Sequence, residues 1–264
     1  MTPMEKAEHA LNERIAHLQV RLNEAQSDTA RHHLIQAVVV CVALSEGITD
    51  YVRNVQQYAQ SRYGELKEKQ AALTSHHAEL LTAGKGLLEQ LKADPADRNV
   101  RREIEQAQRA MAAIQKTLRK SADTLQRELS PSLRRVDEIA ETVGRLCRAE
   151  DKSELGRSIR LMIGEVLALY RGHPNLPAKG VIDASAWETS ALSSVEETTE
   201  FDDAHARAGF QILVALQVMT LAVSPAPPLT AEDATQRANE AVAQRIQRIT
   251  ARLGSPRSLD GDAG

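Results

Sequence analysis

A run of eight apolar residues, 37–44, interrupts a chain that is otherwise rich in Glu, Gln, Arg and Lys. A membrane-spanning helix needs about 20 mostly apolar residues, and this run is bounded by Gln36 and by Ser45 and Glu46. Its valines would suit a strand, but apolar residues continue from Leu34 to Val55 at spacings of three and four, the period of a helix. We therefore expect a helix that is buried on nearly all sides, at the centre of a helical body.

The second half of this helix, which we expect to reach about Leu91, carries a leucine every seven residues, and residues 100–118 carry a second heptad pattern. Between the two patterns, Pro95 disfavours a continuing helix, and Asp97 or Asn99 can cap a new one. This arrangement predicts an antiparallel helical hairpin whose tip lies at 93–99 and whose arms of about 35 residues reach roughly 50 Å. The candidate coiled-coil interface consists of Leu66, Leu73, Leu80, Leu87, Ile104, Met111 and Leu118.

The remaining segments complete the expected all-α fold, in which a long antiparallel coiled-coil hairpin projects from a multi-helix bundle to give an elongated protein. Residues 1–170 are expected to hold an N-terminal amphipathic helix, the hairpin, which kinks or breaks at Pro131, and a bundle helix. Residues 171–201 are acidic and rich in Ser and Thr, which predicts an irregular loop. Two C-terminal helices within 202–253 complete the bundle, and residues 254–264 are predicted to be a disordered tail.

The composition agrees with long helices, because 42% of the residues are hydrophobic and 26% charged, but only 3% are aromatic. Enzymes with shaped pockets usually carry more aromatic residues and glycines. The net charge of −3 speaks against a strongly basic nucleic-acid binder. Cys41 and Cys147 both sit among apolar residues at helical spacing, which predicts buried thiols in a reducing compartment. The first residues lack the apolar core of a signal peptide, so we expect a cytoplasmic protein.

Motifs of catalysis are missing from the sequence: it contains no GxGxxG, GxxxxGK[ST], HExxH, GxSxG or CxxC. Asp202 and His205 have the i, i+3 spacing of a carboxylate–imidazole motif, but a di-iron bundle needs two such motifs and two further carboxylates. We expect Asp202 or Asp203 to cap a helix instead. We therefore predict no catalytic, cofactor-binding or metal-binding residues, and a protein that is not an enzyme.

Three arginines, Arg98, Arg101 and Arg102, lie near the expected hairpin tip. Basic residues close to an anionic membrane contribute about 1 kcal/mol each to binding. We take these arginines as a candidate contact for anionic lipid or for a protein partner. The alternative is a solvated helix face with mixed i, i+4 charge pairs.

Exposed leucines on a hairpin favour association with another helical surface. Our first hypothesis is therefore a coiled-coil scaffold or adaptor that self-associates through its long helices, preferably as a dimer, and offers its hairpin to a protein partner.

The order and length of the expected helices in residues 1–150 resemble BAR domains and the phage-shock-protein A and ESCRT-III group. The resemblance implies a peripheral protein that binds or shapes a membrane, at its inner face, and carries over no individual residues. A third hypothesis is a component of a helical pore-forming toxin, in which the apolar segment 210–223 would enter a membrane.

Overall fold

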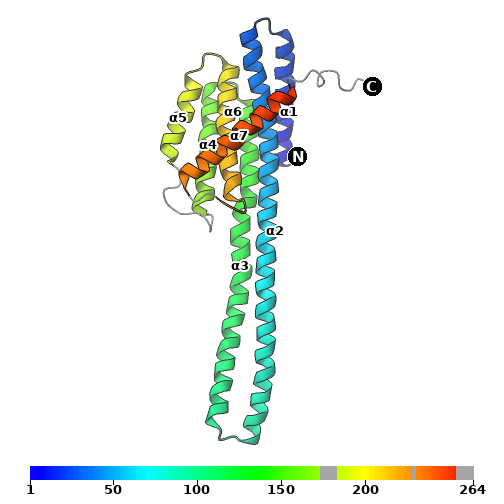
Figure 1. The fold of residues 1–264 in the computed structure, drawn as a ribbon, viewed down its shortest axis with the longest axis vertical. Helices are drawn as coiled ribbons and strands as arrows, with labels where there is room; N and C mark the ends of the chain where they lie inside the picture. Colours follow the sequence, from blue (N-terminus) through cyan, green and yellow to red (C-terminus); the bar gives the residue numbers. More distant parts are fainter. Residues whose placement is uncertain (173–182, 228–229, 254–264) are drawn as a thin grey trace, which may run out of the picture. The chain divides into compact units, whose positions relative to one another are not determined.

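The structure, a computed structural model, describes residues 1–172, 183–227 and 230–253, apart from the side chains of 121–133 and 231. Every regular element in these ranges is a helix, which confirms the all-α class (Figure 1). The helices are α1 (Pro3–Glu24), α2 (Asp28–Ala93), α3 (Arg98–Arg148), α4 (Lys152–Gly172), α5 (Ala184–Glu196), α6 (Phe201–Ala222) and α7 (Ala231–Leu253).

Short polar caps determine where several helices begin. Thr2 and Glu5 form a reciprocal capping box at α1, with Thr2 N donating to Glu5 Oε2 at 2.8 Å and Glu5 N donating to Thr2 Oγ1 at 3.2 Å. At the start of α2, Ser27 Oγ accepts from Ala30 N at 3.2 Å, so Ser27 is the cap. α3 has no such boundary at Pro131, since it runs as one helix from Arg98 to Arg148. A break at Pro131 is therefore wrong.

The chain forms two compact units, which we call the body (residues 1–58 and 131–264) and the hairpin (residues 59–130). The main hydrophobic core lies wholly in the body. The valine run is at its centre: residues 37–41, 43 and 44 are all less than 9% exposed. In the body, α4 and α5 both pack on α6, and α7 lies across α6 (Figure 1). The prediction of a buried central helix is confirmed.

The acidic stretch 171–201 departs from the predicted irregular loop because it contains α5. Asp183 caps this helix by accepting from Ala186 N at 3.0 Å. Ala191 is 0% and Val195 2% exposed, so one face of α5 belongs to the core. The apolar face was hidden from sequence reasoning because single apolar residues are spread among Ser, Thr and Glu. The predicted disordered tail, 254–264, lies outside the described residues.

By length and composition alone, α2 is apolar enough to cross a membrane, with a mean hydropathy of 1.5 over its most apolar 18 residues. The buried core helix of a soluble protein passes the same test, and 56% of this window is buried inside the molecule. Its uninterrupted apolar run, residues 37–44, is also shorter than the roughly 20 mostly apolar residues of a spanning helix.

Candidate interaction site

The hairpin turn is built from two aspartates. Asp94 Oδ1 accepts from Ala96 N at 3.0 Å, and Asp97 Oδ1 accepts from Asn99 N at 2.8 Å and from Val100 N at 3.2 Å. Asp97 therefore caps α3, which was one of the two predicted candidates. Both carboxylates accept hydrogen bonds within the turn. Since the arginines at the start of α3 follow directly, the tip carries acidic and basic groups side by side.

The three arginines predicted as a contact site lie in the first turn and a half of α3, and all three are exposed. They do not form one cluster. Arg101 Nη2 donates to the carbonyl of Pro95 and so supports the turn. Arg98 and Arg102 are four residues apart and share the face of α3 that points away from α2.

Within the hairpin, half-buried positions recur at spacings of three and four along both arms, and we call this set the seam. In α2 the seam consists of Leu66, Gln70, Leu73, His77, Leu80, Gly84, Leu87 and Leu91, and in α3 of Val100, Ile104, Ala107, Met111, Ile114 and Leu118. All seven predicted interface residues belong to it. Across the seam, Nε2 of Gln115 lies 3.3 Å from Nε2 of His77, which places these two turns beside each other.

The seam is poorly shielded compared with the body. Of its apolar residues only Ile114, at 8% exposure, counts as buried, whereas Leu18 and Leu44 of the body are fully buried. Next to the seam, Leu81 is 45% and Leu88 49% exposed. These two leucines are seven residues apart and therefore lie on the same flank of α2. Two helices alone leave this apolar flank facing water.

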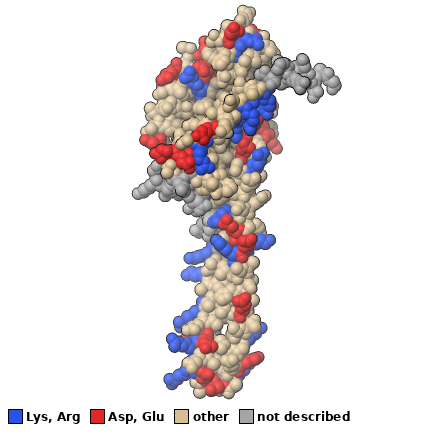
Figure 2. All heavy atoms as spheres, viewed as in Figure 1, with Lys and Arg blue, Asp and Glu red and all other residues tan. Residues whose placement is uncertain are grey.

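A stripe of basic side chains runs along the face of α3 opposite the seam. Its members, at spacings of four and seven, are Arg98, Arg102, Arg109, Lys116 and Lys120, and all are exposed. Figure 2 shows Lys and Arg along this edge of the hairpin, with Asp and Glu scattered over the face in view. One carboxylate interrupts the stripe: Glu105 lies 3.4 Å from Arg109. The corresponding face of α2 carries Glu68, Ser75, Thr82 and Glu89, so the backs of the two arms differ in charge.

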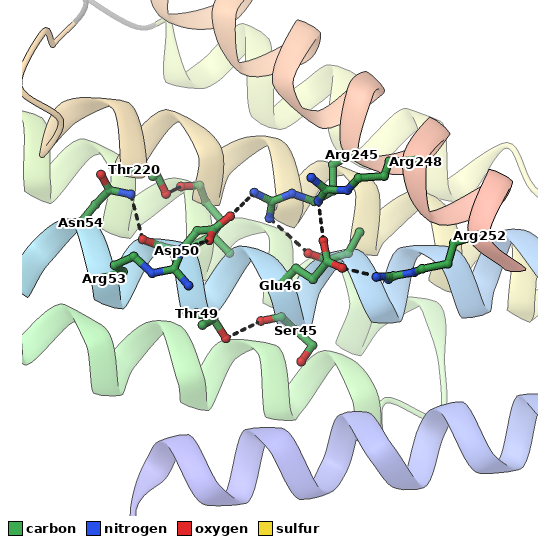
Figure 3. Close-up of polar contacts among 12 residues, drawn as sticks. Ser45, Glu46, Thr49, Asp50, Arg53, Asn54, Thr220, Arg245, Arg248 and Arg252 are labelled. Atoms are coloured by element: carbon green, nitrogen blue, oxygen red, sulfur yellow. Dashed lines mark hydrogen bonds and ion pairs between the residues drawn. The ribbon is translucent and has the colours of Figure 1, made fainter. Parts of the chain in front are cut away.

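A second polar cluster joins α7 to α2 within the body (Figure 3). Arg245 Nη2 lies 2.6 Å from Asp50 Oδ2, and Glu46 receives Arg248 at 2.7 Å and Arg252 at 2.9 Å. Burial opposes ionisation of Glu46, but hydrogen bonds from Arg252 and Arg248 outweigh it and hold the pKa of this carboxyl below its usual value.

The approach of α7 depends on Gly47. A Cβ there would lie 2.9 Å from Nη1 of Arg245 and 3.0 Å from side-chain atoms of Leu213 and Leu216. The groove beside this cluster has a volume of about 510 Å³ and is lined by Ser45, Glu46, Thr49, Asp50, Arg53, Arg248 and Arg252. Because its charges pair with one another, we assign the cluster a role in holding α7 in place.

The Asp202–His205 pair belongs to the contact of α6 with α1. Asp202 is 8% exposed and pairs with Arg14 at 3.0 Å and with Arg21. Glu200 is the N-cap of α6, and no side chain caps this helix, so the predicted capping by Asp202 or Asp203 is wrong. The partners of Asp202 were beyond sequence reasoning, because Arg14 lies 188 residues away along the chain.

Within the described ranges, no three His, Cys, Asp or Glu residues are grouped so that they could hold a metal ion. Cys41 and Cys147 are both buried and free, as expected from their positions. Burial raises the pKa of Cys41 to about 12, and it raises the pKa of Cys147 as well. Neither thiol is therefore primed as a nucleophile at neutral pH.

No protein-family model matches the chain, and neither the curated proteins nor the solved structures include a significant match to it.

Proposed function

We propose that this protein is a non-enzymatic scaffold that self-associates by pairing its hairpin with the hairpin of a second copy. The observation that carries the proposal is the poorly shielded apolar flank of the hairpin, with Leu81 and Leu88 nearly half exposed beside a half-buried seam. Burying apolar surface contributes about 25 cal/mol per Å², and heptad-spaced leucines favour another helix as the cover.

The distribution of charge on the hairpin is compatible with a second copy as the cover of this flank. The basic stripe of α3 and the carboxylates of Glu68 and Glu89 lie on the backs of the arms, where they stay in water when the flanks meet, and Lys85 is the charged residue between Leu81 and Leu88 on the flank itself. Repulsion between the basic backs of two α3 helices also disfavours contact of copies through those faces. Paired hairpins would form a four-helix assembly, in which each seam gains the cover that two helices do not supply.

The oligomeric state tests the proposal. We expect the purified chain to sediment as a dimer in analytical ultracentrifugation, and the double variant Leu81→Glu/Leu88→Glu to sediment as a monomer. A carboxylate at either position would have to be buried without a partner in the dimer but stays in water in the monomer. A wild-type chain that is monomeric at every concentration, or a double variant that dimerises as well as the wild type, would refute hairpin pairing.

Val20→Glu provides the matched control. Val20 is 56% exposed on α1 in the body, so this change introduces a carboxylate at a similarly exposed apolar position away from the hairpin. We expect the control to dimerise like the wild type. Circular dichroism should show the same helix content for all three chains, because none of the substituted side chains lies in the core.

A second candidate function, binding to an anionic membrane, is favoured by the basic stripe of α3. The stripe runs from Arg98 to Lys120 and therefore covers about 33 Å of helix. Anionic vesicles should then pellet the protein, with binding weakened by salt. Arg102→Glu/Arg109→Glu should abolish pelleting, whereas Lys85→Glu/Lys92→Glu, which changes the net charge equally on the other arm, should not. A chain left in solution at low salt would exclude this function.

A further inference from the structure

The body contains a pocket of about 690 Å³ between α5, α6 and α7, separate from the hairpin. A volume of this size suits a small organic molecule. It is lined by Asp183, Trp187, Ser190, Phe210, Gln211, Val214, Val218, Glu232, Thr235, Gln236 and Asn239.

The interior of the pocket is apolar and aromatic. Val214 and Val218 of α6 are 5% and 2% exposed, while Trp187 and Phe210 are half-buried. Trp187 Nε1 donates to Gln211 Oε1 at 3.4 Å, which ties α5 to α6 at this place. The chain has one Trp, two Phe and four Tyr, and Trp187 and Phe210 both line this pocket. Together with the two valines, these rings give the pocket a broad apolar surface that can cover part of a ligand.

The charge of the lining has one sign. Asp183 and Glu232 are carboxylates, and the other polar residues that line the pocket, Ser190, Gln211, Thr235, Gln236 and Asn239, are uncharged; none of these described lining residues is basic. Two arginines of the same region are engaged elsewhere, Arg160 with Glu188 at 3.1 Å and Arg237 with Asp233 at 3.3 Å. The pocket therefore presents negative charge above an aromatic and aliphatic interior.

We propose that this pocket binds a small organic cation, an ammonium group carried on an apolar body. The carboxylates of Asp183 and Glu232 attract the ammonium, and the face of an indole ring stabilises a nearby cation as well. The apolar part of the ligand replaces water against Phe210, Val214 and Val218. An anionic ligand of the same shape is repelled, and a neutral one loses the electrostatic contribution.

Three probes with one apolar body and different head groups test the charge preference: 4-phenylbutylammonium, 4-phenylbutanol and 4-phenylbutanoate. Because Trp187 is the only tryptophan, its fluorescence reports binding at this pocket directly. We expect a saturable change with the ammonium probe, weaker binding of the alcohol, and binding of the carboxylate weaker than that of the ammonium by about tenfold or more. Titration calorimetry, which does not depend on Trp187, should give the same order.

Variants of the lining locate the interaction. Asp183→Asn/Glu232→Gln should lower the affinity for the ammonium probe by about three- to tenfold, since exposed charge pairs contribute up to about a factor of five each. The affinity for the alcohol should stay unchanged. Asn at 183 still caps α5, so the helix start is retained. Phe210→Ala should lower the affinity for all three probes. Glu188→Gln is the matched control: it removes a carboxylate from α5 beside Trp187 but outside the lining, and binding should be unaffected.

A flat titration with the ammonium probe in both measurements would overturn the proposal. So would equal affinity for the three head groups, or an equal loss in Glu188→Gln and the double variant. The site is independent of hairpin pairing, so Leu81→Glu/Leu88→Glu should bind the ammonium probe as the wild type does.

Discussion

His205 shows how a single buried residue couples several elements of the body. It is 0% exposed, and its Nε2 lies 3.0 Å from the carbonyl of Leu146 in α3. Because a carbonyl only accepts, Nε2 carries the hydrogen and Nδ1 is the unprotonated nitrogen. Nδ1 has no hydrogen-bond partner among the described residues, and Arg14 of α1 and Asp202 of α6 are the charged groups that act on the ring.

This environment makes stability depend on pH. Burial, together with the charge of Arg14, lowers the pKa of His205 to about 4, while the Leu146 hydrogen bond and Asp202 act in the opposite direction. In the unfolded chain the pKa is about 6.5. The stability that the folded state gains from neutral His205 is therefore complete above pH 6.5 and is lost as pH falls toward 4. Over this range the unfolded chain binds a proton that the folded chain still excludes. The loss amounts to about 3 kcal/mol.

We expect His205→Gln to lose less stability than the wild type between pH 7 and pH 4.5, because glutamine can still donate to Leu146 but does not titrate. Urea unfolding at the two pH values measures this difference. His9→Gln, on an exposed part of α1, is the control and should keep the wild-type response. An unchanged response in His205→Gln would show that other groups cause the acid sensitivity.

Gly209 lies where α6 packs tightly against α2. A Cβ at this position would lie 2.5 Å from Cγ1 of Val40 and 3.5 Å from Cδ1 of Leu44. Gly209→Ala should lower the free energy of unfolding by about 2 kcal/mol, because a contact this short places the overpacking cost near the upper end of about 1–3 kcal/mol, while alanine regains about 1 in a helix. Gly164→Ala on α4 meets nothing within 4 Å and should stabilise the protein by up to about 1 kcal/mol. Urea denaturation should show these opposite signs; equal signs would contradict the close packing.

At the scale of elements, the attachment of α7 depends more on one arginine than on the other two. The side chain of Arg245 is 10% exposed and also donates to the carbonyl of Ala43 at 3.4 Å, whereas the side chains of Arg248 and Arg252 are 64% and 58% exposed. Arg245→Gln should lower the free energy of unfolding by about 2 kcal/mol, because it leaves Asp50 without its best partner. Arg252→Gln should change it by less than about 1 kcal/mol. Chemical denaturation of both variants tests this ranking, and a larger effect at Arg252 would refute it.

Periodicity in the sequence was sufficient to predict the long helices. It was not sufficient to predict which helices pack against one another. The stripes of α2 and α3 and the break at Pro95 located the hairpin turn, because a heptad pattern and a proline are local signals. The body contacts join residues far apart: Arg245 and Asp50 are separated by 195 residues. A helical face shows which side is buried but not which helix covers it. α5 was missed for a related reason, since its short apolar face is diluted by polar residues of low helix preference.

On the scale of the whole molecule, the core cluster lies entirely in the body, so the stability of the body should not depend on the length of the hairpin. Deleting residues 78–84 and 107–113 removes one heptad from each arm and keeps the order of seam positions. We expect the thermal midpoint followed by Trp187 fluorescence to stay within about 2 °C of the wild type. A clearly lower midpoint would show that the body relies on the hairpin.

The same deletion bears on the proposed assembly, because it removes Leu81 but keeps Leu88. Sedimentation should then show a weaker dimer than that of the wild type, since less apolar flank is available for burial. A dimer of unchanged strength would place the contact outside the hairpin.

The two buried cysteines make the natural chain a convenient background for site-specific labelling. Alkylating reagents attack the thiolate, and both native thiols are held in the protonated form and away from solvent. Ser75 is exposed on the back of the α2 arm, so Ser75→Cys should take up one maleimide dye per chain under native conditions, while the wild type takes up none. Energy transfer between dyes on two such chains would then measure directly how their hairpins are arranged in the assembly.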